Sequence, residues 1–147
     1  MRRFLVVNGP NLNALGRRDV VLYGRLTLEE VEERIRARAE ELGVEVALFQ
    51  SNSEGALIDY LQQEASGAQG IIINPGGLTT TSISLRDALV DTRLPVVEVH
   101  LSNIHGREEW RSKSVVAPIA VGQVSGLGWR GYLYALDFLA AHTREGE

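Results

Sequence analysis

The chain has no cysteine and a single lysine, Lys113, among its 147 residues. The absence of cysteine excludes disulfides, thiolate metal sites and a cysteine nucleophile. Covalent chemistry through a side-chain amine has only Lys113 as a candidate. The net charge of −4 argues against a nucleic-acid partner, and the longest runs of basic residues are pairs, Arg2-Arg3 and Arg17-Arg18.

Long apolar runs are also missing. The first apolar run, residues 4–7, is too short for a signal peptide, and no apolar stretch is long enough to span a membrane. We therefore expect a cytoplasmic protein. What remains is an ordinary globular composition, with 44% hydrophobic and 23% charged residues. A chain of this length and composition predicts one domain over residues 1–147.

Short, β-branched apolar runs alternate with segments of helical pattern. The predicted strands are residues 4–7, 44–49, 70–73, 96–99 and 119–124. The predicted helices are residues 27–42, 53–65 and 82–90, with a last one ending near residue 142. Continuous apolar strands indicate that both faces of the sheet are covered. The pattern predicts an α/β fold with a flavodoxin-like, doubly wound, five-stranded parallel sheet.

Four of the predicted strands run into polar side chains. These are Asn8, Gln50, Asn74 and His100. Parallel sheets of this type bind ligands at the carboxyl ends of their strands. We therefore expect an enzyme whose site lies at that edge.

The segment 95–114 carries the densest chemistry. Glu98 and His100 are two residues apart on a strand and so share a face. A carboxylate beside an imidazole orients the ring and favours its protonated form, which suits a general acid. The alternative is a surface salt bridge, but the preceding apolar run favours burial. A polar cluster follows: Ser102, Asn103, His105, Arg107, Glu108, Glu109 and Arg111.

The connection after the first strand is unusually long for a βα loop. It contains Asn11, Arg17, Arg18 and Tyr23, and we expect residues of about 9–25 to form an active-site lid. The alternative is a surface loop with solvated arginines and a packed tyrosine. The residues alone leave both interpretations open.

Two other ligand sites are disfavoured. The sequence GLGWRG at 126–131 matches a dinucleotide fingerprint, but too little chain follows it for the ribose-binding acid, so a tight turn is expected. His100, His105 and Glu98 have poor spacing for zinc. No metal and no cofactor is expected.

Five segments together resemble the type II 3-dehydroquinate dehydratase family. They are residues 8–31, 50–59, 73–89, 98–114 and 126–136, in family order. The resemblance implies a flavodoxin-like fold and dehydration of 3-dehydroquinate to 3-dehydroshikimate without metal or cofactor. It further implies a homododecamer built as a tetramer of trimers.

The resemblance also assigns catalytic roles. Tyr23 would be the base that takes a proton from C2, and Arg18 would stabilise its phenolate. Asn11 would hold a water against the enolate. His100, oriented by Glu98, would protonate the departing C1 hydroxyl.

The resemblance likewise implies how the substrate is bound. Asn74 would hydrogen-bond near C1, and the backbone N–H groups of Leu101 and Ser102, with the Ser102 hydroxyl, would hold the carboxylate. Arg111 would bind the ring hydroxyls. Asp87 would reach the site from a neighbouring subunit.

One position departs from the family. Thr80 stands where members usually carry histidine, so we expect an active enzyme with altered substrate affinity. Two alternatives stay open on the residues. One is a nucleotide- or flavin-binding module, and the other is a non-catalytic scaffold of the same fold.

Overall fold

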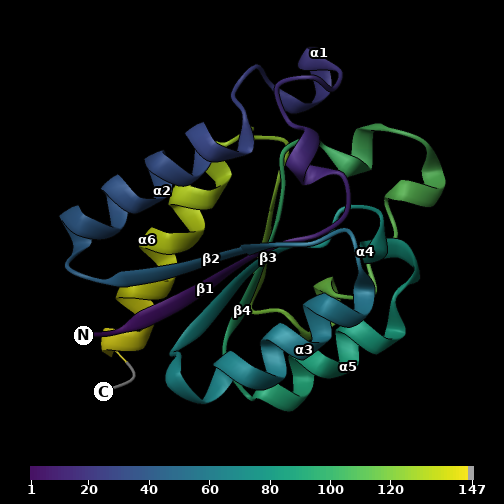
Figure 1. The fold of residues 1–147 in the computed structure, drawn as a ribbon. Coiled ribbons are helices and arrows are strands. Elements are labelled where there is room, and N and C mark those ends of the chain that lie inside the picture. Colours follow the sequence, from purple (N-terminus) through teal and green to yellow (C-terminus); the bar gives the residue numbers. More distant parts are fainter. Residues whose placement is uncertain (146–147) are drawn as a thin grey trace.

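Five parallel strands form the central sheet of the computed structural model, which describes residues 1–145 (Figure 1). Their order across the sheet is β2-β1-β3-β4-β5, the flavodoxin-like order expected from the sequence. The strands are β1 (Arg3–Asn8), β2 (Glu45–Gln50), β3 (Gly70–Asn74), β4 (Val96–His100) and β5 (Gly122–Ser125). The predicted α/β, doubly wound architecture is confirmed.

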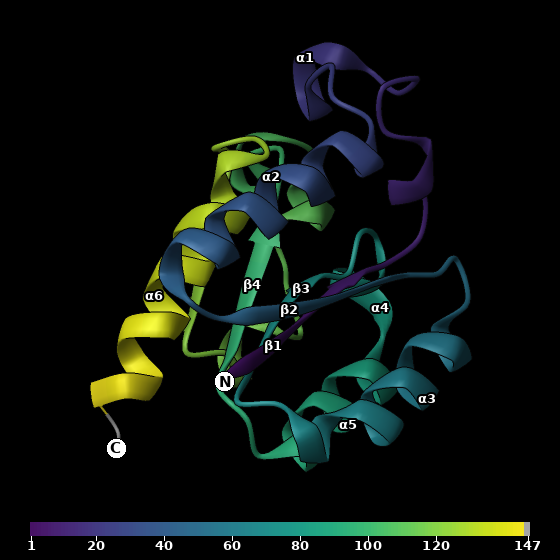
Figure 2. The same ribbon diagram turned by 60° about the vertical axis from the view of Figure 1, so that its left-hand side comes forward.

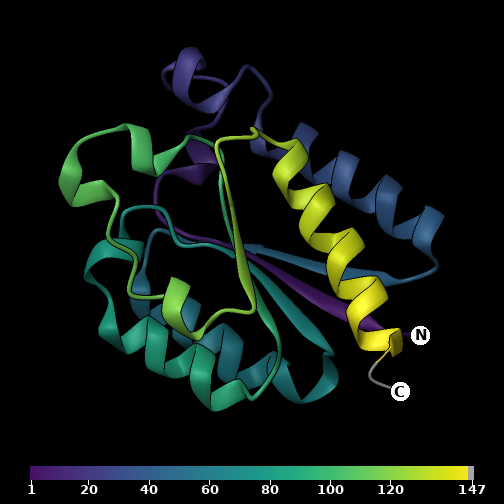
Figure 3. The ribbon, with the colours of Figure 1, turned by 180° about the vertical axis from the view of Figure 1, so that it is seen from behind.

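Helices cover both faces of the sheet. Helices α2 (Leu28–Leu42) and α6 (Arg130–Glu145) lie on one face, and α3 (Glu54–Glu64) and α5 (Ile83–Thr92) lie on the other. Figure 2 shows the two layers from the side, and Figure 3 shows α6 running across the back of the sheet. Each layer buries its own apolar cluster, so β1, β3 and β4 are buried along almost their whole length. Within residues 1–145, no helix is both long and apolar enough to cross a membrane.

Local sequence signals set the ends of the helices. The Thr27 hydroxyl accepts from the Glu30 backbone amide while the Glu30 carboxylate accepts from the Thr27 backbone amide, so the two residues form a capping box at the start of α2. Helix α2 is capped at its C-terminal end by Gly43, whose φ of 70° suits glycine. Ser53 and Ser82 cap α3 and α5, as expected for serines in these places.

The last strand differs from its prediction. It begins at Gly122, and not at Ile119, because Ala117–Ile119 forms a 3-10 turn around Pro118. Proline has no N–H to give to a strand ladder, which favours the turn. Two short helices were also not predicted: α1 (Val20–Tyr23) and α4 (Leu78–Thr81).

The polar strand ends meet at one edge of the sheet, as predicted. Asn8 pairs in register with Gln50 on one side and with Asn74 on the other, and His100 pairs with Ser125. The connections after β1, β3 and β4 gather beyond this edge (Figure 1). This edge is therefore where the fold can build a site.

Candidate active site

A cavity of about 190 Å³ opens at the carboxyl ends of the strands. Its walls come from the connections that follow β1, β3 and β4. Nine residues predicted from the sequence line it: Asn11, Arg18, Tyr23, Asn74, Thr80, His100, Leu101, Ser102 and Arg111. The fold thus brings together residues that are up to a hundred positions apart in the chain.

Two of the predicted site residues do not line this cavity. Glu98 is fully buried beneath His100 and acts on the cavity only through it. Asp87 lies on α5 with an exposed side chain, 3.7 Å from the guanidinium of Arg86. A role for Asp87 in this chain's own cavity is therefore not supported, whereas a role in a neighbour's cavity is compatible with its exposure.

Glu98 and His100 form a buried acid–base pair. His100 Nε2 lies 2.5 Å from Glu98 Oε2. Burial acts to raise the pKa of Glu98, but the hydrogen bonds from His100, Thr79 and Ser114 outweigh it and hold that pKa below its usual value. Glu98 is thus an ionised carboxylate, which only accepts hydrogen bonds. It follows that Nε2 of His100 carries a proton and that Nδ1 is the nitrogen left for the cavity.

Two hydroxyls hold Glu98 in place, and neither was predicted as a site residue from the sequence. The Thr79 hydroxyl donates to Oε2, and Ser114 Oγ lies 2.8 Å from Oε1. Ser114 itself accepts from the backbone amides of Val116 and Ala117, at 3.1 and 2.9 Å. Its own proton is therefore free for the carboxylate. The expected buried pair is confirmed, and its supporting hydroxyls are additional.

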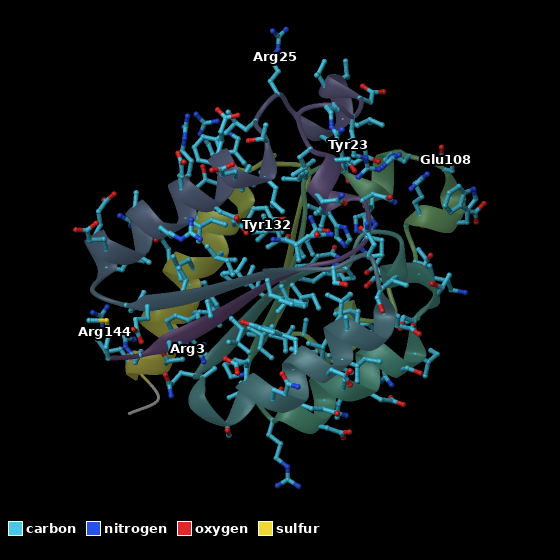
Figure 4. The ribbon with its side chains drawn as sticks, in the orientation of Figure 1. Arg3, Tyr23, Arg25, Glu108, Tyr132 and Arg144 are labelled. Atoms are coloured by element: carbon cyan, nitrogen blue, oxygen red, sulfur yellow. The ribbon has the colours of Figure 1, made fainter. Side chains whose placement is uncertain are left out.

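Tyr23, which lines the same cavity, contacts two arginines. The Arg18 guanidinium carbon lies 3.9 Å from the centre of the Tyr23 ring. Arg107 Nη1 donates to the Tyr23 hydroxyl at 3.0 Å and to Ser102 Oγ at 3.1 Å. Figure 4 shows Tyr23 beneath helix α1, while Arg25 points away from the molecule. A guanidinium that donates to the hydroxyl stabilises negative charge on that oxygen.

Arg107 is thus a site residue that sequence reasoning did not assign. It belonged to the polar cluster after β4, but nothing in its spacing separated it from Arg111. The structure distinguishes the two, because Arg111 Nε pairs with Glu108 Oε2 at 2.5 Å and its guanidinium covers the Trp110 ring. Of these two arginines, it is Arg107 that links the loop after β4 to Tyr23.

The cavity is electropositive. Arg18, Arg107 and Arg111 all line it. None of the described residues along its wall carries a carboxylate. Guanidinium groups bind carboxylates strongly, so the cavity suits a small anionic molecule.

Backbone and amide groups shape the floor. Asn11 has a φ of 73°, and its backbone N–H donates to Asn52 Oδ1 at 2.9 Å, which holds this unusual conformation in place. The Thr80 hydroxyl donates to the Gly77 carbonyl at 3.0 Å, so it is partly satisfied by its own turn. Asn74 is almost fully buried and accepts from the Gly76 amide at 3.1 Å.

Residues 126–129 form the turn between β5 and α6, residues 130–131 begin α6, and none of this segment lines the cavity. A Cβ on Gly126 would meet Asn103 Cβ at 2.9 Å, and φ there is 89°. The glycine therefore serves close packing, as the tight-turn interpretation expected. Lys113 also stays outside the cavity. Over residues 1–145, no group of three or more His, Cys, Asp or Glu side chains is placed to hold a metal.

Comparison with known proteins gives one consistent result. The family model described as Dehydroquinase class II matches residues 2–140. The 3-dehydroquinate dehydratase of Halothermothrix orenii is 54% identical over 146 residues, which is 99% of each chain. That of Roseiflexus castenholzii is 52% identical over 144 residues, covering 98% of this chain and 92% of the relative. The crystal structure of the type II dehydroquinase from Propionibacterium acnes matches with a TM-score of 0.92 and 40% identity, over 96% of this chain and 97% of that one.

Proposed function

The chain belongs to the class II dehydroquinase family, and we propose that its cavity removes water from 3-dehydroquinate with Tyr23 as the base and His100 as the acid. The activity is that of a 3-dehydroquinate dehydratase, a hydro-lyase of the shikimate pathway. One observation carries the assignment of roles. An arginine-bound phenol and a carboxylate-bound imidazole line the same electropositive cavity.

The first step is removal of a proton from C2, the carbon beside the ketone. Tyr23 accepts this proton as phenolate, and the electron pair moves onto the ketone oxygen to give an enolate. Arg107, at 3.0 Å from the phenol oxygen, and Arg18, over the ring, both favour the charged form. Asn11 holds a water against the enolate oxygen, where a fixed dipole stabilises developing charge.

The second step is loss of the C1 hydroxyl. The enolate re-forms the ketone, the C1–C2 double bond forms, and the C1–O bond breaks. His100 gives its proton to the departing oxygen, so that water leaves. Glu98 orients the ring through Nε2. The cycle closes when Tyr23 releases its proton and His100 regains one.

Binding groups surround this chemistry. The backbone amides of Leu101 and Ser102, with the Ser102 hydroxyl, hold the substrate carboxylate. Arg111 binds the ring hydroxyls, and Asn74 donates a hydrogen bond near C1. Support comes from their shared cavity and from Arg107, which fixes the Ser102 hydroxyl at 3.1 Å.

We also propose that residues of about 9–25 act as a lid. The segment contributes Asn11, Arg18 and Tyr23 to the cavity wall. Trypsin would cut after Arg17 or Arg18 in an open lid. A competitive inhibitor should slow this cleavage if the lid closes, and unchanged cleavage at saturation would count against it.

The active unit in this proposal is a homododecamer, built as a tetramer of trimers. Asp87 sits on α5 between Ile83 and Val90, which are 56% and 47% exposed. Positions i, i+4 and i+7 share a helix face, and apolar residues flanking an acid on such a face suit contact with a second copy. Light scattering should give a mass far above 16.2 kDa, whereas a fully active monomer would refute it. The cytoplasmic location remains a prediction, which cell fractionation would test.

The direct test is turnover of 3-dehydroquinate, followed through the ultraviolet absorbance of the conjugated product. The proposal predicts steady dehydration by the purified protein without added metal or cofactor. A folded protein that gives no turnover would favour the scaffold alternative. Bound flavin absorbance, or a thermal shift with NAD or FMN, would favour the nucleotide alternative.

A further inference from the structure

A buried hydrogen-bonded chain links the cavity floor to helix α6. Asn74 Nδ2 donates to the Tyr132 hydroxyl at 3.0 Å, and that hydroxyl donates to Asn8 Oδ1 at 2.6 Å. Both Tyr132 and Asn8 are fully buried, and neither lines the cavity. Figure 4 shows Tyr132 inside the molecule, where α6 passes the sheet. Of the three residues, only Asn74 faces the cavity.

The strand register explains why the two asparagines meet. Asn8 ends β1 and Asn74 ends β3, and they are direct partners in neighbouring parallel strands. Side chains at partner positions point to the same face of a sheet. Tyr132 comes from the helix on that face, so its hydroxyl reaches both amides.

The hydrogen bonds that link Asn74, Tyr132 and Asn8 all run in one direction, with each donor on the Asn74 side. Burial raises the pKa of Tyr132 far above its usual value, so the group stays a neutral phenol with one proton to give. That proton goes to Asn8 Oδ1, which leaves the phenol oxygen as the acceptor for Asn74. Among the described residues, Asn8 Nδ2 has no hydrogen-bond partner, so the series of hydrogen bonds ends at Asn8.

This direction determines what Asn74 offers to the cavity. Its Oδ1 accepts from the Gly76 amide at 3.1 Å, and one hydrogen of Nδ2 goes to Tyr132. An amide nitrogen carries two hydrogens, so one donor remains. If the Asn74 side-chain amide were flipped, its Oδ1 would face the Tyr132 hydroxyl, and its hydrogen bonds with Tyr132 and Gly76 would both be lost.

We propose that Tyr132 is a positioning residue for the dehydration step, because it locks Asn74 with a donor toward the departing C1 oxygen. The place of Asn74 near C1 belongs to the proposed function, on which this inference rests. The leaving oxygen gains negative charge as its bond to carbon breaks, and a fixed N–H stabilises that charge in the transition state more than in the bound substrate. Loss of the hydrogen bond between Asn74 and Tyr132 should therefore lower kcat and leave KM nearly unchanged.

Tyr132→Phe removes only the hydroxyl. We expect kcat to fall about tenfold, less than the hundredfold or more typical for deleting such a donor outright, with KM within about twofold. Tyr134→Phe, on the exposed side of the same helix, should change neither. Leu136→Val, fully buried on α6, should lower Tm but not kcat, which separates lost stability from lost positioning.

A double-mutant cycle with Asn74→Ala decides the matter. If Tyr132 acts through Asn74, Tyr132→Phe causes no further loss of kcat once Asn74 is alanine. Losses that multiply would overturn the positioning role while leaving the proposed function intact. An Asn74→Ala enzyme with parental kcat would instead refute the role of Asn74, and the inference with it. Should Tyr132→Phe fail to fold, Asn8→Ala removes the acceptor of the same chain, and a parental kcat there would equally overturn the inference.

Discussion

Nε2 of His100 lies 2.5 Å from a carboxylate oxygen of Glu98, and Glu98 is fully buried beneath the cavity wall. The two residues sit at i and i+2 on β4, so one strand supplies both the acid and its orienting group. An imidazole held in this way cannot turn, and its Nδ1 has one direction to face. The geometry predicts that Glu98 matters for catalysis although it never touches the substrate.

Glu98→Gln should lower kcat by roughly a hundredfold, within the usual range for a general acid that has lost its orientation and charge support. The neutral amide can place either an oxygen or an N–H against Nε2. Steady-state kinetics over a range of pH measures the effect. His105→Gln is the matched control, since His105 is exposed and bonded to Gln123 outside the cavity. Equal kcat in the Glu98 variant and the parent would contradict the role.

Acid should destabilise the fold through the same carboxylate. The pKa of Glu98 is lowered below 4.5 in the folded chain, so the folded state holds fewer protons than the unfolded state as pH passes this region. The stabilisation is complete above pH 4.5 and is lost as pH falls through the lower folded value. Urea unfolding at a fixed protein concentration, at neutral and acidic pH, should show a smaller acid sensitivity in Glu98→Gln. An identical pH dependence would argue against an ionised Glu98 in the fold.

The fold and most of the cavity could be predicted because local signals agreed with each other. The Thr27–Glu30 capping box, Gly43 and the apolar runs each specify an element from a few neighbouring residues. The polar strand ends then had to meet, since parallel strands end at one edge. Recognition of the family segments supplied the roles of Tyr23, Arg18 and His100.

The rest depended on contacts between distant parts of the chain. Thr79, on the short helix α4, and Ser114, in a loop, both reach Glu98, and in the sequence such hydroxyls look like any helix cap. The bond from Arg107 to Tyr23 spans 84 positions. Tyr132 looks like a core residue until its hydroxyl is placed between two asparagines.

Arg107 should be as important as Arg18. A hydrogen bond to a charged group is worth about 1.5–3 kcal/mol, so Arg107→Ala should lower kcat roughly ten- to hundredfold. Arg107→Lys keeps the charge but not the planar guanidinium, so its kcat should lie between that of the parent and that of Arg107→Ala. Arg25→Ala is the control, since its side chain points into solvent (Figure 4). Parental kcat in Arg107→Ala would show that the contact to the Tyr23 hydroxyl has no catalytic weight.

Thr80→His should improve binding and leave the chemical step unchanged. The family histidine would contact the substrate ring away from the reacting carbons, and such a hydrogen bond is worth about 0.5–1.5 kcal/mol. We expect KM to fall by roughly two- to twelvefold at similar kcat. Thr81→His, one residue on and outside the cavity wall, is the matched control. A rise in kcat of about a hundredfold would instead place position 80 in the chemical step.

The most direct test of the central claim is the kcat of Tyr23→Phe. The substitution deletes the proton acceptor and keeps the ring that packs against Arg18. Circular dichroism and light scattering should match the parent, which shows that fold and assembly persist. With Tyr23 as the base, turnover of 3-dehydroquinate should fall by several orders of magnitude, on the order of a thousandfold or more. A folded Tyr23→Phe enzyme that keeps substantial turnover would contradict the assignment of Tyr23 as the base.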